Sequence, residues 1–83
     1  MKQCTDKQQT AKLIELGFEK PFFLRRAYLI GELIEMLNGV SELEITRYGS
    51  GWGIYDELRA FTGEELIDNL FDMILKLKEE GVI

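Results

Sequence analysis

The sequence predicts a small α+β domain in which two helices precede a β-hairpin and a third helix covers its sheet. Three stretches with apolar residues at helical spacing each end in a glycine followed by a hydrophobic residue, at Leu16-Gly17-Phe18, Asn38-Gly39-Val40 and Glu80-Gly81-Val82. Glycine adopts the left-handed conformation that ends a helix at no steric cost, so each triplet predicts a helix stop. Between the second and third stops, residues 43–57 alternate in polarity as strands do.

The first helix is predicted over about Thr5–Leu16. Thr5 followed by Gln8 has the spacing of a capping box, in which each side chain bonds the other residue's backbone amide. After the glycine stop we expect Phe18 to fold back onto Leu13. The apolar side of this helix consists of Ala11, Leu13, Ile14 and Leu16.

Two adjacent phenylalanines, Phe22 and Phe23, follow Pro21, which prevents the first helix from continuing. Large apolar side chains are usually buried, so we expect this pair to form a lid over the core. The alternative is an exposed patch that binds a partner.

The second helix is predicted over about Leu29–Asn38. Its apolar residues recur at i, i+3, i+4 and i+7 and form a single stripe, which consists of Ile30, Leu33, Ile34 and Leu37. The beginning of this helix is weakly marked, because no Ser, Thr, Asp or Asn directly precedes it.

Residues 43–57 are predicted to form a hairpin that turns within Gly49-Ser50-Gly51. A loop with an even number of residues, such as Ser50-Gly51, places the hydrophobic side chains of both strands on one face, whereas an odd loop divides them. We therefore expect an even loop, with one face made of Leu43, Ile45, Trp52 and Ile54. Residues 58–61 either extend the second strand or form a short third strand.

The third helix is predicted over about residues 63–80. Thr62 followed by Glu65 is a second capping-box spacing. After the last glycine stop we expect Val82 to pack on Leu77. A two-stranded sheet is marginal alone, so this helix is expected to cover its apolar face.

The third helix also provides the main indication of function. At 100° per residue its apolar residues span roughly 200°, which is wider than a face resting on one sheet needs. Either the first two helices flank this arc, or Phe71 and Leu75 at its far side contact another chain. The sequence favours a non-catalytic protein-interaction module in one domain, with a homodimer through this helix as one form of it. Its expected interaction surface consists of an open strand edge and of Phe71, Leu75, Phe22 and Phe23.

A basic and aromatic patch is the basis of an alternative function, that of a nucleic-acid-associated accessory protein. Its basic residues are Lys20, Arg25, Arg26 and Arg47. Charge opposes this alternative: residues 1–55 hold seven acids and seven bases, and residues 56–83 hold eight acids and three bases, which gives the net charge of −5. An acidic surface repels phosphates, so we expect neither nucleic acid nor a membrane as the partner.

Residues for catalysis are scarce. The chain of 83 residues has no histidine, the commonest general base and transition-metal ligand, and its one cysteine is Cys4. Glu64, Asp68 and Asp72 share a side of the third helix, and we interpret them as a solvated face and not as a metal site. We therefore expect no enzymatic activity, no metal or cofactor and no small-molecule ligand. The first seven residues lack the apolar core of a signal peptide, so the expected location is the cytoplasm.

Both ends of the chain resemble those of a group of short uncharacterised bacterial proteins from gut species and their mobile elements. Residues 61–83, which run from Phe61-Thr62-Gly63-Glu64-Glu65 to Glu80-Gly81-Val82-Ile83, look like the ends of these proteins. Residues 10–21, which begin Thr10-Ala11-Lys12-Leu13, are similar to their beginnings. The resemblance implies a bacterial, cytoplasmic origin and implies no particular activity.

Overall fold

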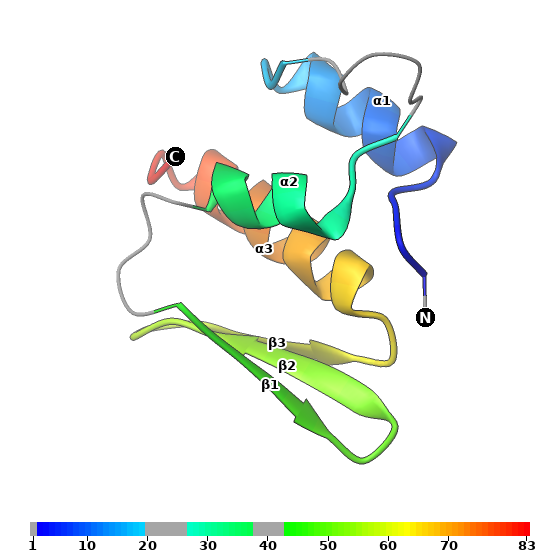
Figure 1. Ribbon diagram of the computed structural model, residues 1–83. Coiled ribbons are helices and arrows are strands. Elements are labelled where there is room, and N and C mark those ends of the chain that lie inside the picture. The colour runs from blue at the N-terminus through cyan, green and yellow to red at the C-terminus, as the bar shows by residue number, and fades with distance from the viewer. Residues whose placement is uncertain (1, 20–26, 38–42) are drawn as a thin grey trace.

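The computed structural model describes residues 2–19, 27–37 and 43–83. Within these residues the chain forms three helices and one three-stranded antiparallel sheet with the strand order β1-β2-β3. In chain order the elements are α1 (Lys7–Glu15), α2 (Ile30–Met36), β1 (Glu44–Tyr48), β2 (Gly51–Tyr55), β3 (Ala60–Gly63) and α3 (Leu66–Glu79). The predicted α+β fold, with the C-terminal helix packed on the sheet, is confirmed (Figure 1).

The described helices all lie on one side of the sheet (Figure 1). α3 contacts β2 and β3 on one side and α2 on another, and α1 forms the layer farthest from the sheet. α3 therefore lies at the centre of the fold and supplies most of the core. The buried hydrophobic residues are Leu13, Tyr28, Leu33, Leu37, Ile54, Leu66, Ile67, Leu70, Met73, Ile74 and Leu77.

The capping box of α1 lies one residue later than the sequence predicts. The Gln9 amide donates to the Asp6 carboxylate over 2.8 Å, and the Asp6 amide donates to the Gln9 side chain over 3.0 Å. Thr5 is buried instead, and its hydroxyl accepts the Tyr28 amide over 2.9 Å. The predicted Thr5–Gln8 pair was wrong because Asp6 caps a helix at least as well and Thr5 is needed in a tertiary contact.

α2 begins with a contact that the sequence did not reveal. The backbone amide of Leu29, the N-cap residue, donates to the Glu32 side chain over 3.0 Å. This amide has no acceptor within the helix, so the glutamate three residues later supplies one. Leu33 and Leu37 are buried, but Ile34 is 36% exposed. The predicted apolar stripe of α2 is therefore buried only in part.

The two described glycine stops are confirmed. Gly17 and Gly81 have φ angles of 98° and 76°. The Phe18 amide donates to the Leu13 carbonyl over 3.2 Å, and the Val82 amide donates to the Leu77 carbonyl over 2.9 Å. This six-residue closure is the Schellman arrangement. Phe18 packs against the core, whereas the Val82 side chain is 49% exposed. The predicted stop at residue 39 lies outside the described residues.

The hairpin has an even loop, as the sequence predicts, but the loop consists of Gly49 and Ser50 and lies one residue earlier than the predicted Ser50-Gly51. Gly49 has a φ of 57°, which suits a tight hairpin turn. The register pairs Ile45 with Ile54, so the predicted hydrophobic face is confirmed. This face packs against the core beneath α3.

A third strand, β3, completes the sheet. A short third strand was one of the two alternatives that the sequence predicts for residues 58–61. It continues through Thr62 to Gly63, and α3 begins later, at Leu66. The predicted capping box of Thr62 and Glu65 was therefore wrong. Thr62 pairs with Gly53 of β2, and the Glu65 carboxylate accepts the Lys2 amide over 2.7 Å. The backbone partners that β2 offers override the local capping pattern.

Candidate functional site

Two of the four hydrophobic residues predicted for protein interaction lie in the described part of the chain. Phe71 is half-buried and packs against the core, and Leu75 is half-buried. Phe22 and Phe23 lie outside the described residues.

Of the four residues of the predicted basic patch, Arg47 lies in the described part of the chain. Arg47 is exposed, and its guanidinium lies 5.2 Å from the centroid of the Trp52 ring, in a cation–π contact. Three members of the patch, Lys20, Arg25 and Arg26, lie outside the described residues.

The α3 side that carries Phe71 and Leu75 is tied to the N-terminal part of the chain by two contacts. The side-chain amide nitrogen of Gln9 donates to the Asp68 carboxylate over 2.8 Å. The Lys78 ammonium lies 5.4 Å from the centroid of the Phe18 ring. Phe71 and Leu75 lie between these two contacts along the helix, within about 80° of them at 100° per residue. The N-terminal part of the chain therefore contacts α3 on either side of Phe71 and Leu75 along the helix, through Gln9 of α1 and through Phe18.

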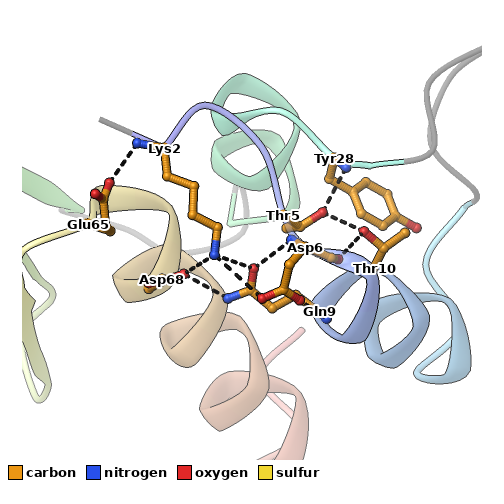
Figure 2. Close-up of polar contacts among 8 residues, drawn as sticks. All are labelled: Lys2, Thr5, Asp6, Gln9, Thr10, Tyr28, Glu65 and Asp68. Atoms are coloured by element: carbon orange, nitrogen blue, oxygen red, sulfur yellow. Dashed lines mark hydrogen bonds and ion pairs between the residues drawn. The ribbon is translucent and has the colours of Figure 1, made fainter.

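A polar cluster around Lys2 holds the N-terminal segment against the beginning of α3. The Lys2 ammonium donates to Gln9 over 3.1 Å and to Asp68 over 2.8 Å. Figure 2 shows the Lys2 side chain reaching Asp6, Gln9 and Asp68, while its backbone meets Glu65. Contacts between residues more than 60 positions apart thus close the fold at this end.

The pKa values in the Lys2 cluster follow from this pairing. The hydrogen bond to Asp68 raises the pKa of the Lys2 ammonium. Burial raises the pKa of the Asp68 carboxyl, whereas hydrogen bonds from Lys2 and Gln9 and the charge of Lys2 lower it. The lowering effects are larger in sum, so the pKa of Asp68 lies below its usual value. Partial burial and the charge of Asp68 raise the pKa of the Asp72 carboxyl. Burial, ion pairing and repulsion between carboxylates account for the directions of these pKa shifts.

A second polar cluster ties the turn between β2 and β3 to the end of α3. The Asp56 carboxylate accepts the backbone amides of Leu58 and Arg59 over 2.8 and 2.6 Å and the Arg59 guanidinium over 2.9 Å. Arg59 also donates to both oxygens of Glu80, over 2.9 and 3.1 Å. Burial raises the pKa of the Asp56 carboxyl, and these hydrogen bonds lower it below its usual value. Asp at the first position of a turn was the available sequence signal for this cluster.

The backbone of β3 has unused hydrogen-bonding groups. The Asp56 amide donates to the Arg59 carbonyl over 3.0 Å, so these two residues form a hydrogen-bonded pair next to the turn. Such pairs alternate along an antiparallel ladder, so Phe61 and Gly63 direct their amides and carbonyls toward β2. Ala60 and Thr62 direct theirs away from the sheet. In the described part of the chain nothing pairs with these outward groups.

The two edges of the sheet differ in composition. β1 carries Glu44 and Arg47, and charged residues on an edge strand discourage pairing with another chain. β3 has the sequence Ala60-Phe61-Thr62-Gly63, without charge or proline. Its short length is the one protective feature that this strand shows.

Exposed residues extend this surface beyond both ends of β3. Leu58, in the turn before the strand, is 83% exposed, and Glu57 beside it is exposed as well. Glu64, directly after the strand, is also exposed. We use the term β3 edge for strand β3 together with Glu57, Leu58 and Glu64.

The β3 edge rests on a fixed support. The Arg59 cluster holds its beginning, and the buried Asn69 side chain donates to the Trp52 carbonyl over 3.1 Å next to its end. A preorganised edge loses little conformational entropy when a partner binds. This geometry makes the β3 edge the best candidate for a binding site.

Two further findings concern the described residues. They contain no helix long and apolar enough to cross a membrane. No group of three or more Cys, Asp or Glu side chains among them is placed to hold a metal ion.

Comparisons with known proteins add no relative to this picture. The chain matches no protein-family model, no curated protein and no solved structure.

Proposed function

We propose that the protein is a non-catalytic protein-interaction module that binds an extended segment of another chain as an additional strand at the β3 edge. The observation that carries this proposal is the row of outward amides and carbonyls on Ala60 and Thr62, which have no partner in the described structure. Strand addition uses such groups for affinity and neighbouring side chains for specificity.

The physical properties of the edge favour a reversible complex. Two residues supply two donors and two acceptors, and each backbone hydrogen bond contributes about 1 kcal/mol net. Leu58 is available for an additional apolar contact, because 83% of its surface is exposed. The sheet is already folded on its helical support, so binding requires little rearrangement of this chain.

The β3 edge is better suited to a partner than the α3 side that the sequence favours. Gln9 and Phe18 contact α3 next to Phe71 and Leu75, whereas nothing in the described part of the chain covers the backbone of β3. A homodimer through α3 and a role with nucleic acid stay predictions, and the experiment below is designed to detect both.

The test compares Thr62→Pro with Thr62→Val in capture of partners from a bacterial lysate, with and without nuclease treatment. Proline removes the outward amide of Thr62 without removing a donor to β2, and edge strands tolerate it there. Valine keeps this amide and changes the exposed side chain. We expect the native chain and Thr62→Val to retain the same stoichiometric partner and Thr62→Pro to lose it.

Circular dichroism and thermal unfolding establish first that both variants are folded. Equal capture by folded Thr62→Pro would rule out the β3 edge as the docking site. Partners that disappear on nuclease treatment would favour the nucleic-acid alternative. Recovery of untagged copies of this chain alone would favour the homodimer.

A further inference from the structure

We infer that the partner of the β3 edge is a segment of another protein with basic residues on both sides of about four uncharged residues. The inference rests on the proposed function and names the class of its partner. Its basis is the distribution of charge around strand β3, whose own four residues are uncharged.

Both ends of the β3 edge are acidic. Glu57 lies before the strand and Glu64 directly follows it, and both side chains are exposed. Neither forms an ion pair with the described residues. The basic residue between Glu57 and the strand, Arg59, is already bound by Asp56 and Glu80, and this group of three keeps one excess negative charge. A basic side chain of a bound strand would therefore meet unneutralised carboxylates at either end.

The same charge disfavours a second copy of this chain as the occupant. Residues 56–83, which contain β3 and α3, hold eight acids and three bases and carry the whole net charge of −5. Pairing two β3 edges would bring these two acidic parts together. Like charges oppose association, whereas a basic partner is attracted and oriented by them.

The test uses two synthetic peptides with the same extended core of alternating valine and threonine, four residues long. One carries two lysines at each end and the other carries two glutamates at each end, with both termini blocked. Binding is followed by nuclear magnetic resonance, through chemical shifts and through hydrogen exchange of the Ala60 and Thr62 amides. We expect the lysine peptide to slow exchange at these two amides by at least about threefold, because a ladder bond protects an amide from solvent.

A double variant, Glu57→Gln with Glu64→Gln, tests the source of the specificity. We expect it to bind the lysine peptide roughly fivefold more weakly, which is the size expected when two exposed ion pairs are removed. The matched control, Glu15→Gln with Glu35→Gln, removes two exposed charges from α1 and α2 and should bind as the native chain does. Raising the salt concentration from about 0.05 to 0.5 M should remove most of the difference between native and double variant.

Each other outcome overturns the inference in a distinguishable way. Equal protection of Ala60 and Thr62 by both peptides would leave strand addition intact and reject a basic partner. Binding of the lysine peptide without protection of these amides would indicate charge attraction alone. Protection that rises with protein concentration in the absence of peptide would identify a second copy as the occupant. Absence of binding by either peptide would reject the inference, while the capture experiment decides separately on the proposed function.

Discussion

Asp68 and Asp72 lie one turn apart on α3, yet their surroundings shift the pKa values of their carboxyls in opposite directions. Asp68 is paired with Lys2 over 2.8 Å, whereas partial burial and then the charge of Asp68 raise the pKa of the Asp72 carboxyl. We predict that Asp68→Asn lowers the free energy of unfolding at pH 7, by less than about 1 kcal/mol because solvent screens the pair. Asp72→Asn should raise it slightly. Urea unfolding of the two matched variants measures both changes, and a decrease for Asp72→Asn would contradict this account.

The pH dependence of the same pair has a defined sign. The pKa of Asp68 in the folded chain lies below its usual value of 3.8, so its contribution to stability is present above about pH 4 and is lost as the pH falls through the lower folded pKa. We therefore predict that the stability difference between the native chain and Asp68→Asn is constant from pH 7 to pH 5 and shrinks below about pH 4. Urea unfolding across this range is the measurement. A difference that persisted to pH 2 would show that Asp68 acts by packing and not by charge.

At the scale of single elements, Gly51 in β2 and Gly31 in α2 differ in the space available for a side chain. A Cβ atom on Gly51 of β2 would lie 2.8 Å from the Gly63 carbonyl oxygen, so the backbone of β3 would have to shift. A Cβ on Gly31 of α2 would meet nothing within 4 Å. Gly51 therefore permits the close approach of β2 and β3, and Gly31 has no comparable role.

We predict opposite effects of alanine at these two positions. Gly51→Ala should lower the unfolding midpoint and speed hydrogen exchange of the Phe61 amide, because it disturbs the β2–β3 ladder. Gly31→Ala should raise the free energy of unfolding by about 0.5 kcal/mol, because alanine restricts the unfolded chain more than glycine does. Thermal and urea unfolding test both. A stabilising Gly51→Ala would show that the two strands are less closely paired than described.

At the scale of the whole molecule, α3 packs on the sheet on one side and on α2 on another (Figure 1), and Gln9 of α1 contacts the first turn of α3. Phe71 packs against the core. We predict that Phe71→Glu lowers the thermal unfolding midpoint and leaves the mass in solution unchanged, because it places a charge in a half-buried apolar contact. Leu58→Glu, at an 83% exposed position, is the control and should leave stability nearly unchanged. A dimeric native chain made monomeric by Phe71→Glu without loss of stability would assign Phe71 to an interface.

The periodic patterns predicted the elements well because they report local conformation. The glycine stops at Gly17 and Gly81 depend on one backbone conformation, and the hydrophobic face of the hairpin depends on a period of two. Local patterns failed where a contact with a distant part of the chain competed with them. Thr62 had capping chemistry, but pairing with Gly53 of β2 took precedence, so α3 began later and a third strand formed.

The sequence by itself determined the fold class, the two described stops and the shared face of the hairpin, because each follows from residues close together in the chain. Tertiary structure alone decided where the candidate site lies. The outward groups of Ala60 and Thr62 became available because β3 is the last strand of its sheet, and strand order depends on distant pairing. The ion pair of Lys2 and Asp68 joins residues 66 positions apart. No local pattern encodes such contacts, since they depend on which surfaces meet when the chain is folded.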